Sequence, residues 1–270
     1  MSEQTRSPGD DQQTGDDTAM EAEFDTIASW TEEALAELGP GHAIPAACRG
    51  SGAPADLEWL AGGLDLSGED HFLDAGAGLG GPAAWLVEHL GTRWRGRPLL
   101  VEPMTAAAAS SRRLFEFPTV AAEGEHLPLR DGAVDAAWSL GVLCTTPAKG
   151  AQLDELHRVL TPGGRLALLV LVADTTPLPE SPEGNHFPTR ESLSDELRRA
   201  GFDLDAQVDA LDLPEPSPDW SRRADRVTEI VARDHSDHPS WLQADQQHAI
   251  LGRLMDQRHV VATLIRATRR

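Results

Sequence analysis

Residues 73–81 read LDAGAGLGG, a stretch with four glycines and one acidic side chain. A glycine turn between a strand and a helix lets backbone N–H groups approach a ligand at the helix N-terminus. Gly76, Gly78 and Gly81 have the GxGxxG spacing of dinucleotide-binding loops, whereas Gly76, Gly78 and Gly80 fit a second pattern in the same nine residues. The loop therefore predicts a nucleotide-type ligand and leaves its identity open.

Two carboxylates narrow the choice of ligand. Asp74 lies two residues before Gly76, where an acid is a poor neighbour for a pyrophosphate and a good one for a cation or an ammonium group. Glu102 ends the next predicted strand, 21 residues after Gly81, where a carboxylate can accept hydrogen bonds from both hydroxyls of a ribose. Glu102 is compatible with both glycine patterns and does not distinguish them. Asp74 does distinguish them, because it favours a ligand with a positive end.

These residues lie in a region where strands and helices alternate, which is typical of a doubly wound α/β domain. We expect strands at 71–75, 97–103, 118–123, 134–140, 165–173, 202–213 and 258–269, with helices at 82–90, 105–115, 149–160 and 190–200 between them. The uninterrupted apolar run 165–173 belongs in the middle of a sheet that is covered on both faces. Two further helices, 222–233 and 241–255, interrupt the alternation before the last strand.

The same reading divides the chain into four parts. Residues 1–20 are acidic and polar and are predicted to be a disordered tail. Residues 21–66 are predicted to form an N-terminal helical cap, with helices at 20–38 and 56–61. Residues 67–213 and 258–270 form the predicted core, and the helical insertion 214–257 is predicted to be a lid over an acceptor pocket.

Composition excludes several classes of function. The formal net charge of -21 disfavours binding to a nucleic-acid backbone. The chain shows no basic start followed by an apolar run, and no apolar stretch of membrane-spanning length, so we expect a soluble, cytoplasmic protein without a membrane partner. Cys48 and Cys144 form no CxxC motif, and His235 with His238 lack a matching third ligand, so no metal site is predicted.

Four ordered segments resemble the class I S-adenosylmethionine-dependent methyltransferases, of the type that acts on small molecules. They are LDAGAGLGGPA, VEP, EGEHLPLRDGAVDAAWSLGVL and LHRVLTPGGRLAL, and together they cover roughly residues 70–172. The resemblance implies a Rossmann-like, mostly parallel seven-stranded sheet with an antiparallel last strand. It also implies S-adenosyl-L-methionine as cofactor and a small-molecule acceptor, which suits secondary metabolism.

The resemblance further implies a role for each cofactor-binding residue. Asp74 would face the methionine amino group, Glu102 would bind the ribose hydroxyls, and Glu123 would accept from the adenine amino group although the family usually has Asp there. Arg49 is the candidate clamp for the methionine carboxylate. The other implied cofactor contacts are Ala75, Gly76, Gly78 and Gly80 in the loop, Pro103, Met104, Gly124 and Glu125 beside the adenine, and Leu140 and Gly141 beneath the sulfonium.

Candidates for the acceptor side are fewer. Tyrosine is absent, so a general base must be a histidine or a carboxylate. His186, after the fifth strand, is the candidate catalytic residue because that loop lies at the carboxyl ends of the strands. The other predicted substrate contacts are His42, Cys144, Trp220 and Trp241.

Two other functions stay open at this stage. The GxGxxG match is compatible with an NAD(P)-dependent oxidoreductase, although the other three segments argue against it. The departures at Glu123 and Cys144, where relatives often carry Asp and His, are compatible with a binding protein that keeps the fold without methylation activity. The acceptor atom (O, N or C) and the oligomeric state, a homodimer included, are not readable from the residues.

Overall fold

A computed structural model describes residues 8–270, with side chains described from residue 22 onward. Its centre is a seven-stranded sheet in the order β3-β2-β1-β4-β5-β7-β6. The strands are β1 (Phe72–Ala75), β2 (Pro98–Val101), β3 (Thr119–Val120), β4 (Val134–Leu140), β5 (Leu160–Ala173), β6 (Phe202–Asp209) and β7 (Val260–Arg269). The strand β7 runs antiparallel between β5 and β6, and the other neighbouring pairs are parallel. The predicted α/β fold with an antiparallel last strand is confirmed.

Helices cover both faces of this sheet, as the apolar run of β5 requires. One face carries α3 (Pro54–Leu64) and α4 (Gly81–Leu90), and the other carries α6 (Lys149–Val159) and α7 (Arg190–Arg199). Trp138 in β4 is fully buried, and Phe72 in β1 packs edge-on against it with ring centroids 5.1 Å apart. The core therefore lies directly beneath the loops that follow β1 and β4.

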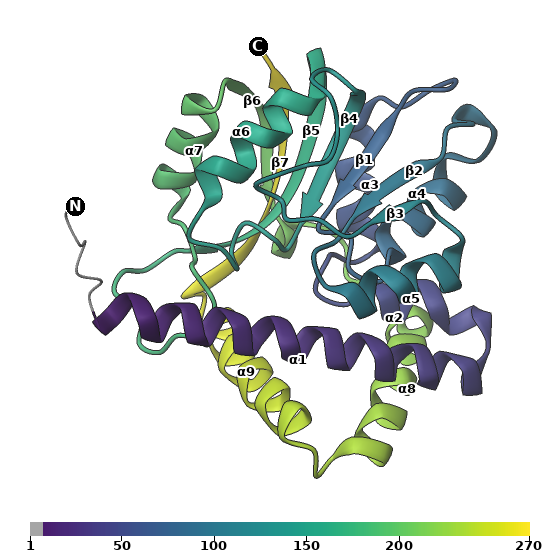
Figure 1. The fold of residues 1–270 in the computed structure, drawn as a ribbon, viewed down its shortest axis with the longest axis vertical. Coiled ribbons are helices and arrows are strands. Elements are labelled where there is room, and N and C mark those ends of the chain that lie inside the picture. The colour runs from purple at the N-terminus through teal and green to yellow at the C-terminus, as the bar shows by residue number, and fades with distance from the viewer. Residues whose placement is uncertain (1–7) are drawn as a thin grey trace, which may run out of the picture.

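The remaining long helices lie along the carboxyl-terminal edge of the sheet, where α1 (Pro8–Leu38) crosses and α8 (Pro218–His235) and α9 (Pro239–Asp256) lie beyond it (Figure 1). The helix α5 (Thr105–Phe115) packs against α1, and η1 (Pro40–His42) leads into α2 (Ala43–Ala47). Two short turns, η2 (Gly91–Arg93) and η3 (Ala210–Asp212), complete the described elements.

Two of the predicted boundaries between the tail, the cap and the core differ in the structure. The helix α1 begins at Pro8, so residues 8–20 of the predicted tail are helical, and residues 1–7 lie outside the described part of the chain. Proline near the N-terminus and the acids that follow it favour a helix start. The helix α3 lies against β5 and β7 and buries Leu57, Leu60 and Leu64, so it belongs to the core layer and not to the cap. The predicted insertion is found as α8 and α9.

Within residues 8–270, none of the helices has the length and apolar character needed to cross a bilayer.

Candidate functional site

The glycine loop after β1 is fastened to the end of β2. Gly76 and Ala77 donate their N–H groups to the Val101 carbonyl at 2.8 and 3.1 Å. Gly76 has φ of 78°, which L side chains rarely adopt, and Gly80 has φ of 82° at the N-cap of α4. These conformations need glycine because a Cβ would be strained there. The loop thus presents the N-terminus of α4 at the carboxyl edge of the sheet.

Glu102 is held in place by backbone donors on both of its carboxylate oxygens. Gly78 N–H donates to Oε2 at 2.7 Å and Met104 N–H donates to Oε1 at 3.0 Å. The side chain is 2% exposed, and this burial raises its pKa to about 7 against the opposing effect of the two N–H donors. Each oxygen keeps a free lone pair. The residue is therefore oriented to accept two further hydrogen bonds, as a ribose diol offers.

Asp74 is a buried carboxylate with an unused oxygen. Its side chain is 2% exposed and its Oδ2 has no partner within the described residues. Burial raises its pKa to about 7. The Trp138 side chain opposes this rise of the pKa only in part, and a buried carboxylate is costly unless it is neutralised or paired. Asp74 therefore fits a ligand that brings a positive charge, which is the fit expected for the amino end of the predicted cofactor.

The segment after β4 closes the site from the other side. Val142 packs against Gly76, because a Cβ built on that glycine would lie 2.3 Å from Val142 Cγ2. Gly141 has φ of 80° and faces the Gly50 carbonyl at the end of the cap. His186 donates its backbone N–H to the Cys144 carbonyl at 2.7 Å, so the loop after β5 lies over the end of β4. The loops after β1, β2, β4 and β5 thus meet at one edge.

Comparison with known proteins agrees with this geometry. A family model described as "Methyltransferase domain" matches residues 73–168, which contain the glycine loop, Glu102 and the segment through β5. Residues 73–168 therefore resemble a methyltransferase domain.

Among curated relatives, methyltransferase GfsG of Streptomyces halstedii is 33% identical over 120 residues, 42% of this chain and 42% of that protein. The 27-O-demethylrifamycin SV methyltransferase of Amycolatopsis mediterranei is 30% identical over 188 residues, 62% of this chain and 65% of that protein. The matched regions thus span less than two thirds of either relative's length.

Solved structures share the fold of this chain. The [4+2]-cyclase SpnF superposes with a TM-score of 0.61 at 21% identity, covering 79% of each chain. Geranyl diphosphate C-methyltransferase of Streptomyces coelicolor, solved with S-adenosyl-L-homocysteine, superposes with a TM-score of 0.59 at 18% identity over 80% of this chain and 77% of that one. At these identities the likeness extends to the fold alone.

The other cofactor contacts predicted for the methyltransferase domain fall on the same edge. Pro103 and Met104 follow Glu102 and are half-buried, and Leu140 ends β4. Glu123 is exposed, and its charge contributes to the raised pKa of Glu102, so the two carboxylates lie near each other. Ala75 ends β1, and Gly124 with Glu125 follow β3, with Gly124 against the Gln152 side chain. Their roles toward a cofactor stay predictions.

A cavity opens within the helical cap of the protein. It has an empty volume of about 750 Å³, part of which is open to solvent. Four helical elements supply its walls, α1, the end of α2, α8 and α9. The lining residues are Ile27, Thr31, Ala46, Arg49, Val227, Thr228, Val231, Trp241, Ala244, Asp245 and His248. The lining includes Trp241 of the insertion 214–257, which the sequence predicts to be a substrate contact.

Arg49 is found in this cavity, paired with a residue of the cap. Its guanidinium donates to Asp225 Oδ1 of α8 at 3.1 Å. Ala46 and Arg49 face the cavity, while Ala47 and Cys48 abut the backbone of Gly81. The end of α2 therefore borders the cavity on one side and contacts Gly81 on the other, and the proposed clamp on a methionine carboxylate stays a prediction.

Other predicted acceptor contacts are placed elsewhere. His42 lies in η1 with a buried Nδ1 that has no partner among the described residues. Cys144 is buried and its Sγ lies 3.3 Å from the Gly141 carbonyl. Trp220 packs against the cluster formed by α3 and the sheet. His248, which sequence reasoning missed because α9 carries no recognisable motif, lines the cavity beside Arg49. Burial, together with the charge of Arg49, lowers the pKa of His248.

His235 and His238 belong to the packing of the cap. The Trp30 ring stacks on His235 at 4.0 Å and meets His238 edge-on at 4.9 Å. His238 also accepts from the Ser240 N–H at the start of α9. The two rings thus join α1 to the turn between α8 and α9.

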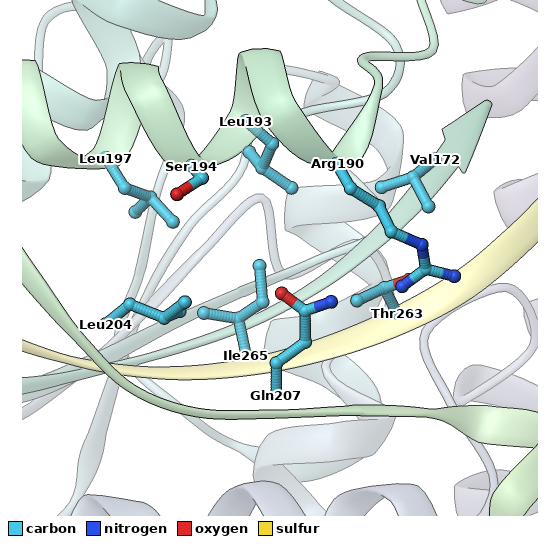
Figure 2. Close-up of a pocket in the computed structure, with 9 residues that line it drawn as sticks. All are labelled: Val172, Arg190, Leu193, Ser194, Leu197, Leu204, Gln207, Thr263 and Ile265. Carbon is cyan, nitrogen blue, oxygen red and sulfur yellow. The ribbon is translucent and has the colours of Figure 1, made fainter. Parts of the chain in front are cut away.

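A smaller hollow lies between α7 and the strands β5, β7 and β6 (Figure 2). Its walls are mainly aliphatic, and its charged group is already paired. Arg190 donates to both carboxylate oxygens of Asp209, at 2.8 and 2.9 Å, and to Thr263 at 3.2 Å. We interpret this hollow as a packing gap.

Asp25 on α1 caps α5 from outside that helix. Its Oδ1 accepts the N–H groups of Ala106 and Ala107 at 2.7 and 3.0 Å. Replacing Asp25 by alanine should cost about 1 kcal/mol of unfolding free energy, the usual effect of losing a helix cap. Urea denaturation measures it, and Asp25→Asn should recover part of the loss. An unchanged midpoint for Asp25→Ala would show that the contact contributes nothing.

Proposed function

We propose that this protein transfers a methyl group from S-adenosyl-L-methionine to a small-molecule acceptor. The observation that carries the proposal is the pair of buried carboxylates at the glycine loop. Glu102 is pre-oriented for two hydroxyl donors and Asp74 has an oxygen free for a positive group. A cofactor with a ribose and an ammonium or sulfonium centre satisfies both, whereas a pyrophosphate would meet the Asp74 carboxylate.

The family match and the relatives support this proposal. The matched model is that of a methyltransferase domain, and the curated relatives bear methyltransferase names, one of them for 27-O-demethylrifamycin SV. The cofactor supplies the reactive methyl group when bound. This chain's own residues then contribute binding and alignment: the loop and Glu102 hold the nucleoside, and the cap excludes water.

Calorimetry tests the cofactor directly. We expect S-adenosyl-L-methionine and S-adenosyl-L-homocysteine to bind with micromolar dissociation constants, and NADH to show no heat of binding at the same concentrations. NADH binding without binding of the sulfur compounds would instead support a nicotinamide-dependent oxidoreductase. A second candidate function is suggested by the shared fold of a protein described as a [4+2]-cyclase. If the cofactor binds and no acceptor is methylated, the result would support a protein that keeps the cofactor site and lacks methylation activity.

We place the acceptor in the cavity of the cap. Its walls combine apolar side chains with five polar ones, Thr31, Arg49, Thr228, Asp245 and His248, and such a combination is typical of small-molecule sites. His186 and Cys144 stay as candidates at the point where the loop after β5 crosses the end of β4. The net charge of -21 supports a small molecule over a nucleic acid as partner, and a cytoplasmic location fits the same proposal. We also propose that the protein acts in secondary metabolism and forms a homodimer.

Filling the cavity should block the acceptor and spare the cofactor. Ala244 lines the cavity from α9, and Ala244→Trp would occupy much of it. We expect kcat/KM for the acceptor to fall by about tenfold or more, because the indole ring would take space that the acceptor needs and even a small misfit between substrate and pocket has an effect of this size. The dissociation constant of S-adenosyl-L-homocysteine should stay unchanged.

The matched control is Leu242→Trp, since Leu242 lies on the same helix and is 57% exposed. This variant should keep the kcat/KM of the unmodified protein. Equal loss in both variants would place the acceptor outside the cavity.

A further inference from the structure

Glu23 is a buried acid that the proposed cofactor site does not use. It lies on α1, is 6% exposed, and its Oε2 has no hydrogen-bond partner within the described part of the chain. Unpartnered buried polar groups are rare in folded proteins, because burial without a hydrogen bond costs free energy. The position therefore calls for a partner that arrives with a ligand.

The helical spacing places Glu23 at the boundary between the cap cavity and the sheet edge. Residues four apart lie on the same face of a helix, so Glu23, Ile27 and Thr31 share one face of α1. Ile27 and Thr31 line the cavity. In the other direction Glu23 lies close enough to Glu183 for that carboxylate to raise its pKa.

Glu183 belongs to the loop that crosses the end of β4. Its N–H donates to Gln247 Oε1 of α9 at 2.9 Å, and its Oε2 accepts from Gln243 Nε2 at 3.5 Å. Three residues later, His186 is bonded to the Cys144 carbonyl. Glu23 thus lies one helical turn beyond Ile27 of the cavity lining, on the side where the loop that contains Glu183 and His186 reaches the end of β4.

The carboxyl group of Glu23 titrates near neutral pH because it is buried. Burial raises the pKa of Glu23 to about 7, and the charge of Glu183 adds to the effect. A carboxyl group with this pKa is matched to proton transfer at physiological pH. The other charged or titratable groups on the elements that pack against α1 include Arg49, Arg113, Asp225, Asp245 and His248.

We propose that Glu23 is the general base that deprotonates a hydroxyl group of the acceptor. The proposal rests on the proposed methyl transfer and narrows its acceptor to an alcohol, phenol or enol oxygen. The acceptor O–H bond breaks and its proton passes to Oε2 of Glu23. The oxygen electron pair forms the new C–O bond to the methyl group, and the pair of the broken C–S bond stays on sulfur. Glu23 then returns the proton to solvent.

The first test measures the titration of Glu23 without any turnover. Infrared difference spectra between pH 5.5 and pH 8.5 should contain the carbonyl band of a protonated carboxylic acid that disappears with a midpoint near 7. The band should be weaker in Glu23→Gln, where Asp74 and Glu102 still contribute to it, and should keep its intensity in Glu33→Gln, since Glu33 is an exposed glutamate of the same helix. In Glu183→Gln the midpoint should move to lower pH. A spectrum that is the same in Glu23→Gln and the unmodified protein overturns the proposal.

The second test measures transfer from methyl-labelled S-adenosyl-L-methionine to a panel of apolar phenols, macrolactone alcohols and amines by mass spectrometry. With a hydroxyl acceptor, kcat of Glu23→Gln should fall by about 100-fold or more, which is a usual contribution of a general base. The rate of the unmodified protein should rise with pH up to about 7 and then level off, because only the deprotonated carboxylate accepts a proton. Glu23→Asp should recover part of the rate, and Glu33→Gln should match the unmodified protein.

Calorimetry distinguishes a failure of the proposed methyl transfer from a failure of the proposed role of Glu23. If the unmodified protein fails to bind the cofactor, the proposed function is wrong whatever Glu23 does. If the cofactor binds and Glu23→Gln retains the full rate, or if products are methylated on nitrogen alone, the proposed function stands and the role of Glu23 is wrong.

Discussion

Replacing Glu102 by alanine is expected to weaken the binding of S-adenosyl-L-homocysteine by about 100-fold or more. Two hydrogen bonds from the ribose to a charged carboxylate contribute about 1.5–3 kcal/mol each, and 1.4 kcal/mol corresponds to a tenfold change in affinity. The variant also releases Gly78 and Met104, whose N–H groups now donate to the carboxylate. Isothermal titration calorimetry measures the change.

The matched controls for this prediction are a conservative change and a distant one. Glu102→Gln keeps an acceptor oxygen and should lose less affinity than the alanine variant. Glu88→Ala removes an exposed glutamate from α4 and should bind normally. If Glu102→Ala binds as tightly as the unmodified protein, then Glu102 is not part of the cofactor site.

The pH dependence of binding should follow the same carboxylate. Burial raises the pKa of Glu102 to about 7 in the unliganded protein. Hydroxyl donors favour the deprotonated form, so below pH 7 the protein must release a proton on binding. Affinity should therefore fall as pH decreases below about 7 and stay constant above it. The free energy of unfolding of the unliganded protein should depend on pH in the opposite direction. It should fall as pH rises from about 4.5 to 7, because Glu102 holds a proton in the folded state that it has lost in the unfolded chain.

Gly81→Ala should destabilise the fold by about 2–3 kcal/mol. A Cβ at this position would lie 2.4 Å from the Ala47 carbonyl carbon and 2.6 Å from the Cys48 nitrogen. These are backbone atoms, which cannot move aside as the end of a side chain can, so α2 must shift away from α4. Overpacking a close contact costs about 1–3 kcal/mol. For a chain of this size such a loss lowers Tm by roughly 4–10 °C, which differential scanning calorimetry resolves.

Gly252→Ala is the matched control for this substitution. Gly252 lies inside α9, and a Cβ there meets nothing within 4 Å. Alanine in a helix interior is favoured over glycine by about 0.5–1 kcal/mol, so this variant should gain stability. Equal Tm values for the two variants would mean that α2 does not rest on Gly81 in solution.

The amino-acid sequence determined the sheet and the cofactor side of the site. Alternating strands and helices, the apolar run of β5 and the glycine turn are local patterns, and each has a physical cause within a few residues. Asp74 and Glu102 were identifiable because parallel strands bring their carboxyl ends to one edge, so a position at the end of a strand already implies a place in the fold. The antiparallel β7 followed from the family resemblance.

The tertiary structure decided the acceptor side. The cavity joins residues of α1, α2, α8 and α9, which are up to about 220 positions apart in the chain, and no local pattern relates them. Glu23 is an ordinary glutamate of an acidic helix in the sequence. It becomes a buried carboxylate only because α1 crosses the sheet edge beside Glu183. Arg49, His248 and Trp241 likewise acquire their surroundings from helix packing, because burial and the charge of distant neighbours, unlike turn geometry or strand periodicity, exist only once the chain has folded.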